Sequence, residues 1–181
     1  MSEYISSLID AIPHDVYVLL LAVFCIFAVL LVSFRGVRKG GRLVFAFLLV
    51  EYVFLLYCST VIFREGVERG YNIVPFWSYV EIYHGDELLL PQNIMNVVVF
   101  VPVGFLLGCA VKSIRWWKVL VIGCFISVSI EVLQFFFKRG FSEFDDVFHN
   151  VIGCMIGYGI YIIVYRINRY GKNLSLSGSH E

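Results

Sequence analysis

The chain has 181 residues, of which 60% are hydrophobic and only 15% are charged. Soluble globular domains carry about 25% charged residues, so the composition argues against an ordinary soluble domain and favours a membrane protein. The formal net charge is zero, and we expect no nucleic-acid partner.

The N-terminal fifteen residues contain Glu3, Asp10 and Asp15 but no Lys or Arg. A secretory signal peptide would begin with a basic region, so this segment is predicted to lead into a span that is retained. The five cysteines all lie within apolar runs. They lack the paired spacing of a zinc site or a disulfide framework, and we interpret them as small hydrophobic residues.

Five segments are apolar over about 20 residues, the length that crosses a bilayer. They are residues 16–34, 43–63, 92–111, 117–137 and 147–165. The first contains no charged residue, whereas the second contains Glu51 and the fourth contains Glu131. We therefore predict an all-α integral membrane bundle of about five transmembrane helices, which forms one domain over residues 16–165.

The basic residues distinguish the two sides of this bundle. Ten of the fourteen Lys and Arg residues follow the first, third and fifth spans. The positive-inside rule then makes residues 1–15 an extracytoplasmic N-terminus and places the C-terminus in the cytoplasm. The predicted location is the cell membrane, with several passes. Residues 166–181, which end in a Ser- and Gly-rich stretch, are predicted to be a disordered cytoplasmic tail.

The longest loop, residues 64–91, lies outside in this topology and is rich in Tyr, Phe and Trp. Such side chains favour the headgroup layer. Two interpretations are open for its middle. One is a short interfacial helix that begins near Pro75 and runs through Tyr83; the other is a loose, aromatic-rich loop.

Polar side chains gather near the outer ends of the last three spans. Spacings of three and four place each pair on one helix face; the pairs are Asn93 and Asn96, Glu131 and Gln134, and Asp146 and Asn150. Lipid tails cannot satisfy these groups, and an intramembrane charge is costly. We expect the pairs to turn inward to a shared site with Arg64, Arg139 and Asp145. The structural alternative is interhelical hydrogen bonding alone, with Arg139 paired to Glu131.

Glycines predict how the helices end and pack. Gly140 is expected to end the fourth helix, and Ser142 or Asp145 to cap the fifth. GxxxG patterns occur in the third and fifth spans, at Gly104 and Gly108 and at Gly153 and Gly157. They are typical of closely packed membrane helices and would also permit a homo-oligomer.

Residues 43–165 resemble the VanZ-like family of small membrane proteins. The resemblance lies in Arg64, in Asn72 with Pro75 and Phe76, in Asn93-Ile-Met-Asn96 leading to Phe100-Val-Pro102-Val-Gly104-Phe105, in Glu131-Val-Leu-Gln134, and in Arg139 followed by Asp145-Asp146 and Asn150 to Gly153. One departure is Glu143, which stands where the family often has an aspartate. The family is named for a protein linked to resistance to teicoplanin, a lipid-bearing glycopeptide antibiotic. The resemblance implies a cell-envelope role and an outer-leaflet site, without implying a reaction.

The first functional hypothesis is a non-enzymatic protein that binds a membrane lipid, a lipid-linked cell-wall precursor or a lipoglycopeptide. Arg64 and Arg139 would receive a phosphate or carboxylate, and no cofactor or metal is expected. The predicted ligand-binding residues are Arg64, Asn93, Asn96, Glu131, Gln134, Arg139, Asp145, Asp146 and Asn150.

Two other hypotheses stay open. A membrane-embedded enzyme would use Glu131 as general base and Asp146 as a second catalytic residue, with Asp145, Asp146 and His149 holding a divalent cation. No nucleophile motif supports it. A transporter would draw on Glu51 near the middle of the bilayer, but the chain has no visible internal repeat.

Overall fold

The computed structural model of the chain describes residues 41–62, 64 and 70–177. Within them, four helices are long and apolar enough to cross a membrane: Gly41–Ile62, Leu89–Ala110, Trp116–Phe137 and Phe144–Tyr170. They correspond to the second to fifth predicted spans, and the all-α membrane bundle is confirmed. The predicted first span, residues 16–34, and the predicted N-terminal segment 1–15 lie outside the described residues.

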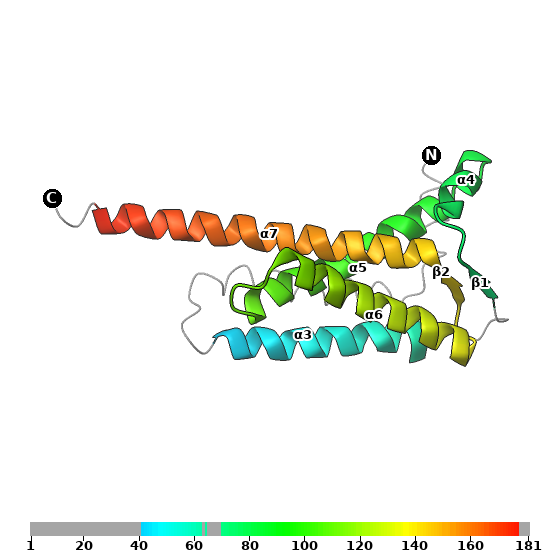
Figure 1. Ribbon diagram of the computed structural model, residues 1–181, viewed down its shortest axis with the longest axis horizontal. Coiled ribbons are helices and arrows are strands. Elements are labelled where there is room, and N and C mark those ends of the chain that lie inside the picture. The colour runs from blue at the N-terminus through cyan, green and yellow to red at the C-terminus, as the bar shows by residue number, and fades with distance from the viewer. Residues whose placement is uncertain (1–40, 63, 65–69, 178–181) are drawn as a thin grey trace, which may run out of the picture.

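The described elements follow one another with short connections. In chain order they are α3 (Gly41–Tyr57), the π-helical segment η2 (Cys58–Ile62), β1 (Gly70–Asn72), α4 (Trp77–Tyr83), α5 (Leu89–Ala110), α6 (Trp116–Phe137), β2 (Phe141–Glu143) and α7 (Phe144–Ser177). Figure 1 shows the long helices alongside one another, with α4, β1 and β2 at the end opposite the α5–α6 connection. That end therefore carries structure beyond the spanning helices.

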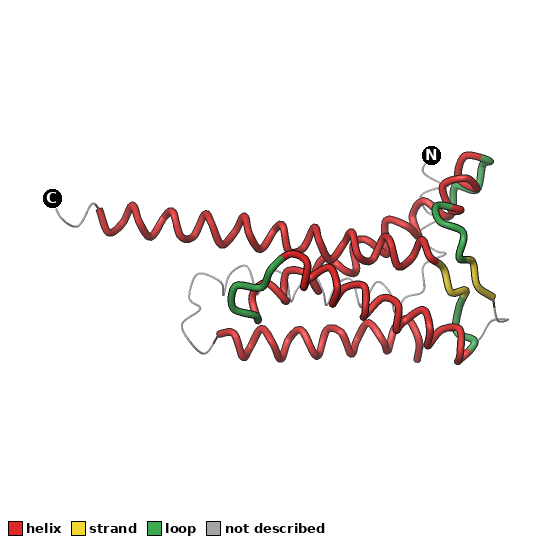
Figure 2. Tube along the Cα trace, in the orientation of Figure 1, coloured by secondary structure: helices red, strands yellow, loops and turns green. Residues whose placement is uncertain are grey.

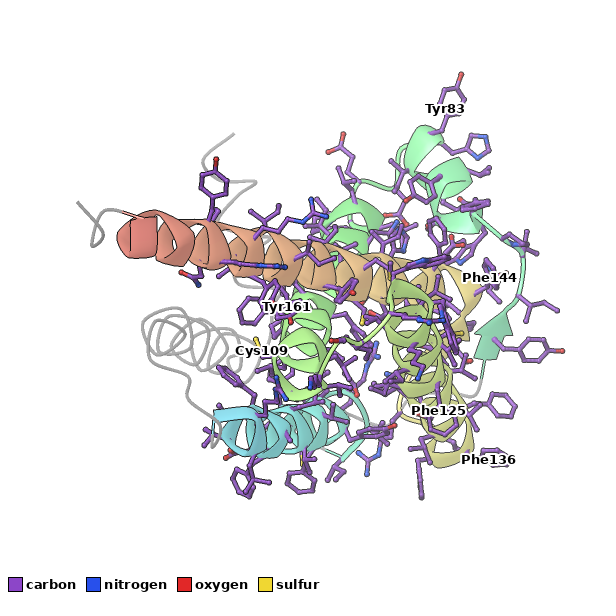
Figure 3. All side chains as sticks on the ribbon, turned by 60° about the vertical axis from the view of Figure 1, so that its left-hand side comes forward. Tyr83, Cys109, Phe125, Phe136, Phe144 and Tyr161 are labelled. Carbon is purple, nitrogen blue, oxygen red and sulfur yellow. The ribbon has the colours of Figure 1, made fainter. Side chains whose placement is uncertain are left out.

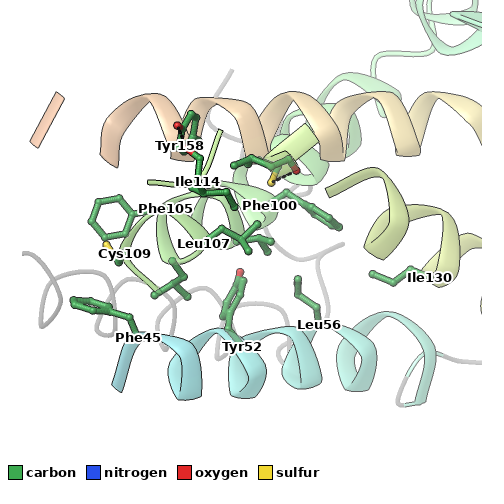
Figure 4. Close-up of a cluster of buried hydrophobic side chains, with 14 of the residues drawn as sticks. Phe45, Tyr52, Leu56, Phe100, Phe105, Leu107, Cys109, Ile114, Ile130 and Tyr158 are labelled. Carbon is green, nitrogen blue, oxygen red and sulfur yellow. Dashed lines mark hydrogen bonds between the residues drawn. The ribbon is translucent and has the colours of Figure 1, made fainter. Parts of the chain in front are cut away.

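Helix α5 lies at the centre of the bundle. It packs most extensively on α7 and next on α3, while α6 packs on α7. Two buried tyrosines in the core have satisfied hydroxyls: Tyr52 donates to the carbonyl of Val99 at 2.8 Å, and Tyr158 donates to that of Ile114 at 2.7 Å. Figure 4 shows Tyr52 directed from α3 toward the α5 side chains. A buried hydroxyl without a partner would be costly, so these bonds fix how the helices meet.

The two GxxxG patterns face each other between α5 and α7. A Cβ added at Gly104 would lie 1.7 Å from the carbonyl oxygen of Cys154, and one added at Gly157 would lie 1.8 Å from that of Val101. No side chain fits at such a distance, so the glycines allow the two backbones to touch. Both glycine faces are thus occupied within one chain and are not free to bind a second copy.

A feature that the sequence did not predict is a pair of short strands. Strand β1 pairs in parallel with β2, with Gly70 opposite Phe141 and Asn72 opposite Glu143. Figure 2 shows the two strands near each other, with a loop leading from β1 toward α4 and β2 running directly into α7. The pairing ties the segment after α3 to the α6–α7 turn. Of the two interpretations left open for the middle of the long loop, the short helix is the one present, as α4.

Two helix ends differ from expectation. Lys138, rather than Gly140, adopts the left-handed conformation that ends α6, with a φ of 57°. The N–H of Arg139 then bonds the carbonyl of Gln134 at 2.9 Å, the long bond of a Schellman motif. Helix α7 continues to Ser177, so the predicted disordered tail is helical to that point. No proline follows Tyr165 to stop it, and one glycine costs a helix only about 1 kcal/mol.

Candidate functional site at the α4 end

Three carboxyl side chains are buried where α6 leads through β2 into α7. Glu131, Glu143 and Asp146, here called the carboxyl cluster, are 5%, 9% and 8% exposed. The backbone N–H of Glu143 donates to Oε2 of Glu131 at 3.0 Å. The side-chain amide of Asn96 donates to Oδ1 of Asp146 at 2.6 Å. The cluster therefore joins α5, α6, β2 and α7.

Two arginines, Arg64 and Arg139, contact each other near the α6–α7 turn, and both are more exposed than the carboxyl cluster. The guanidinium of Arg64 rests against Gly140, where an added Cβ would lie 2.9 Å from its Nη1, and the side chain is exposed. Nη1 of Arg139 donates to the backbone carbonyl of Arg64 at 2.5 Å. The predicted pairing of Arg139 with Glu131 is thus replaced by a bond to backbone.

Burial raises the pKa of Glu143 from its usual value near 4.5 to about 7. The neighbouring carboxylates of Asp146 and Asp145 act in the same direction, while the indole of Trp77 and the guanidinium of Arg64 oppose them. Like charges and loss of water both disfavour the ionised form. The Glu143 carboxyl is therefore more readily protonated near neutral pH than an ordinary glutamate.

Asp145 is fully buried and has a different role from Asp146. Its Oδ1 accepts the N–H of Phe76 at 2.6 Å, and its Oδ2 accepts the N–H and the hydroxyl of Ser78 at 3.0 and 2.6 Å. Asn93 donates to the same hydroxyl at 3.0 Å. Of the two residues expected to cap α7, Ser142 or Asp145, Asp145 instead accepts the N–H groups at the N-terminus of α4. Asp145 and Asn93 thus hold α4 on the bundle.

Two buried amides lie deeper in the helix interfaces. Nε2 of Gln134 donates to the carbonyl of Thr60 at 3.1 Å, and Nδ2 of Asn150 donates to the hydroxyl of Ser127 at 2.9 Å. The Oε1 of Gln134 and the Oδ1 of Asn150 are buried and accept no hydrogen bond in the described structure. Since buried polar atoms are usually satisfied, these two oxygens have unused accepting capacity.

The carbonyl of Thr60 is presented by η2. The hydroxyls of Ser59 and Thr60 donate to the carbonyl of Leu56 at 3.0 and 2.6 Å. Side-chain bonds of this kind compete with the helical ladder, and π-helical turns often occur at functional sites. Local sequence chemistry thus explains why the end of α3 turns a backbone acceptor toward α6.

The cation set of the enzyme hypothesis is not assembled. Asp145 uses both oxygens on α4, and Nε2 of His149 is within 2.7 Å of the Tyr79 hydroxyl. Among residues 41–62, 64 and 70–177, no group of three or more His, Cys, Asp or Glu side chains could hold a metal ion. Asp146 is the one member of that set that lies in the carboxyl cluster.

Exposed apolar side chains surround this end of the bundle. We call them the apolar collar; they are Tyr71, Ile73, Val74, Phe76, Tyr79, Tyr83, Phe136, Phe137, Phe141 and Phe144. Figure 3 shows Tyr83, Phe136 and Phe144 pointing away from the helices. A polar interior ringed by exposed aromatics is the arrangement expected where a membrane protein meets the headgroup layer.

All nine residues predicted to bind a ligand lie at this end, although their contacts differ. Asn96, Glu131 and Asp146 meet at the carboxyl cluster, with Arg64 and Arg139 beside it. The other four, Asn93, Gln134, Asp145 and Asn150, each make a structural hydrogen bond. Ligand binding by any of them stays a prediction.

Several residues that contribute to the site carry little or no local sequence signal. Ser78 lies in α4 and Thr60 lies in η2. No local sequence pattern marks either residue. Ser127 lies four residues before Glu131, so helical spacing could have placed it on the same face. Glu143 was noted only as a departure from a family pattern.

Comparison with known proteins places the chain in context. The family model described as VanZ/LLP1 matches residues 16–165. The chain is also similar to Protein VanZ of Enterococcus faecium, with 29% identity over 115 residues, which cover 59% of this chain and 69% of that protein. No solved structure matches.

Proposed function

The chain belongs to the VanZ/LLP1 family of membrane proteins, and we propose that it binds an amphiphilic envelope molecule at the α4 end. The candidates are a membrane lipid, a lipid-linked cell-wall precursor and a lipoglycopeptide such as teicoplanin. The observation that carries the proposal is the buried carboxyl cluster with exposed Arg64 beside it, ringed by the apolar collar.

The arrangement suits a ligand with a polar head and an apolar tail. Burying three carboxyl groups in one place is unfavourable unless they have partners or a task. Arg64 and Arg139 are positioned to meet a phosphate or carboxylate from the accessible side, where charge-assisted bonds are strong. The apolar collar offers surface to acyl chains. Together these features support binding at the boundary of the bilayer.

We place the α4 end in the outer leaflet of the cell membrane. The short connection between α5 and α6 and the region after Tyr165 carry basic residues such as Lys112, Arg115 and Arg166. Because basic residues are retained on the cytoplasmic side, the opposite end would face outward. An outward site can meet envelope molecules and antibiotics without their crossing the membrane.

A susceptibility assay tests this function. A sensitive Gram-positive host would express wild type, Glu131→Gln or Glu51→Gln at membrane levels matched by immunoblot. Glu51 is exposed on α3, outside the cluster, and provides the matched control. We expect wild type and Glu51→Gln to protect selectively against teicoplanin relative to vancomycin, and Glu131→Gln to lose about tenfold or more of that protection. One charge-assisted bond has this magnitude.

Two outcomes would contradict the proposal in different ways. Equal protection by wild type and Glu131→Gln would make Glu131 structural and remove the site from the function. No protection by any form would show that resistance is not a property of this chain. Binding of envelope lipids would then have to be measured on the purified protein.

The second candidate is a membrane-embedded enzyme that modifies an envelope lipid or precursor, with Glu131 as general base. The observation in its favour is that Glu131 is buried and bonds only through Oε2 within the described structure. An enzyme should lose function in Glu131→Gln while it keeps lipid binding. A binding protein should instead be most sensitive at Arg64 and Arg139.

A further inference from the structure

The carboxyl cluster has more acceptors than donors. Glu131 and Asp146 each use one oxygen for the bonds from Glu143 and Asn96. Within the described part of the chain, no hydrogen bond reaches Oε1 of Glu131 or Oδ2 of Asp146. A buried carboxylate has about four accepting positions, so these groups have capacity for further donors.

One helical turn deeper in the bundle, the buried side-chain amide of Asn150 adds a further hydrogen-bond acceptor without a donor. Asn150 follows Asp146 by four residues on α7, and its partner Ser127 precedes Glu131 by four residues on α6. Asn150 thus lies directly beneath the carboxyls in the α6–α7 interface. It is 5% exposed, and its Oδ1 accepts no hydrogen bond among the described residues. This observation is independent of the carboxyl charges and also indicates a missing donor.

An anionic group would be repelled from this interior position. A divalent metal ion is not favoured either, because the described residues contain no set of three metal-ligating side chains. An ammonium group fits better. It carries three N–H donors and a positive charge, and it has no need of a fixed coordination number.

Arg64 would complement a negatively charged part of the same head group. Arg64 is exposed beside Gly140, whereas Glu131 and Asp146 are buried. A head group with a cation at its tip and an anion nearer its acyl chains would match this order from inside to outside. Zwitterionic phospholipids of the ethanolamine type have this arrangement.

We propose that the cluster receives the primary ammonium of a zwitterionic lipid head group. Glu131 and Asp146 accept its N–H donors, Asn150 lies below them, and Arg64 contacts the phosphate. The assignment rests on the binding function proposed above and specifies its ligand class. The apolar collar then accommodates the acyl chains.

Trp77 provides a reporter for this binding, since its indole lies close enough to Glu143 to influence that carboxyl. The remaining tryptophans, Trp116 and Trp117, begin α6 at the far end and are replaced by Phe in the test protein. Purified full chain in detergent would be titrated with dihexanoyl phosphatidylethanolamine or with dihexanoyl phosphatidylglycerol. The two lipids share acyl chains and phosphate, and differ in the ammonium.

We expect the ethanolamine lipid to bind about tenfold more tightly, as one charge-assisted bond provides. Asp146→Asn should abolish this preference, so that the two lipids bind with equal affinity, since the ammonium contact is lost. Asp86→Asn, in the exposed loop after α4, is the matched control and should behave as wild type. Glu131→Gln replaces Asp146→Asn if the latter fails to fold.

The outcomes separate the two proposals. Equal affinity for both lipids would overturn the ammonium assignment and leave lipid binding intact. No binding of either lipid would overturn the ammonium assignment and would also remove membrane phospholipids from the candidate ligands of the proposed function. A fluorescence change on addition of calcium chloride alone, lost in Asp146→Asn, would assign the cluster to a metal ion and also overturn the inference.

Discussion

Asp145 and Asp146 are adjacent carboxylates whose side chains reach different partners. Successive side chains on a helix diverge by about 100°. Asp145 therefore points to α4, where three donors satisfy it, whereas Asp146 points into the bundle and meets Asn96. Only Asp146 keeps an oxygen for another partner. Because the two positions face different directions on α7, Asp145 has a structural role and Asp146 is a candidate ligand-binding residue.

The first residue-scale prediction concerns this structural acid. Asp145→Ala leaves the N–H groups of Phe76 and Ser78 and the Ser78 hydroxyl without an acceptor. Unsatisfied buried groups are costly. We therefore expect the free energy of unfolding to fall by about 3 kcal/mol and α4 to detach from the bundle. The measurement is the thermal unfolding midpoint in detergent, with limited proteolysis of the loop around α4.

Asp86→Ala is the matched control, because Asp86 is exposed and accepts one local bond from the N–H of Leu88 at 3.2 Å. Its free energy of unfolding should lie within about 0.5 kcal/mol of the wild-type value, as is usual for substitutions of exposed residues. If Asp145→Ala had the same unfolding midpoint and the same proteolysis pattern as wild type, other contacts would have to hold α4. Asp145→Asn, which keeps one acceptor oxygen, should fall between the two.

At the scale of elements, the α5–α7 contact depends on glycine. The carbonyl of Val97 would lie 2.0 Å from a Cβ on Gly153, and that of Val101 would lie 1.8 Å from a Cβ on Gly157. Neither carbonyl can move without disturbing its own helix. Gly104, Gly153 and Gly157 therefore set the separation of the two helices, and this separation holds Asn96 close to Asp146 at the end of the bundle.

The element-scale prediction compares two glycines on α7. Gly157→Ala forces α5 and α7 apart and should destabilise the protein by about 1–3 kcal/mol, the cost of overpacking. A Cβ added at Gly159 would have nothing within 4 Å. Because alanine favours the helix more than glycine does, Gly159→Ala should be as stable as wild type or slightly more stable. Thermal unfolding of both variants checks this. Equal stabilities would mean that the α5–α7 contact adjusts without cost.

The spanning helices could be predicted because long apolar runs have one solution in a bilayer. Pairs such as Glu131 with Gln134 also placed the polar faces correctly at one end, since helical spacing is a local property. Partners across helices are different. Ser78 precedes Asp145 by 67 residues, and no local pattern joins them.

The helix ends were harder to predict for a related reason. Lys138, and not the expected Gly140, adopts the left-handed conformation that ends α6, although glycine is the residue that usually takes it. The β1–β2 pair depends on a contact between two segments that are distant in sequence. Tertiary contacts of this kind leave no local sequence signal.

At the scale of the whole molecule, the two ends of the bundle differ in kind. One end has α4, the strands, the carboxyl cluster and the apolar collar, while the other has a short connection, residues 111–115, between α5 and α6. The distribution of basic residues favours the orientation in which the α4 end faces outward. A lipoglycopeptide can reach the carboxyl cluster from outside the cell only in that orientation.

The last prediction tests the orientation directly. Asp86→Cys and Lys112→Cys place single exposed thiols at the α4 end and at the α5–α6 connection. The native chain is the control, since its cysteines in the described residues are buried or partly buried within the spans. In intact cells, a membrane-impermeant maleimide should label Asp86→Cys and spare Lys112→Cys until the membrane is permeabilised. The reverse pattern would turn the carboxyl cluster toward the cytoplasm. Lipoglycopeptides could not then reach it from outside, although the preference for an ammonium head group would survive, because it depends on the cluster and not on the leaflet.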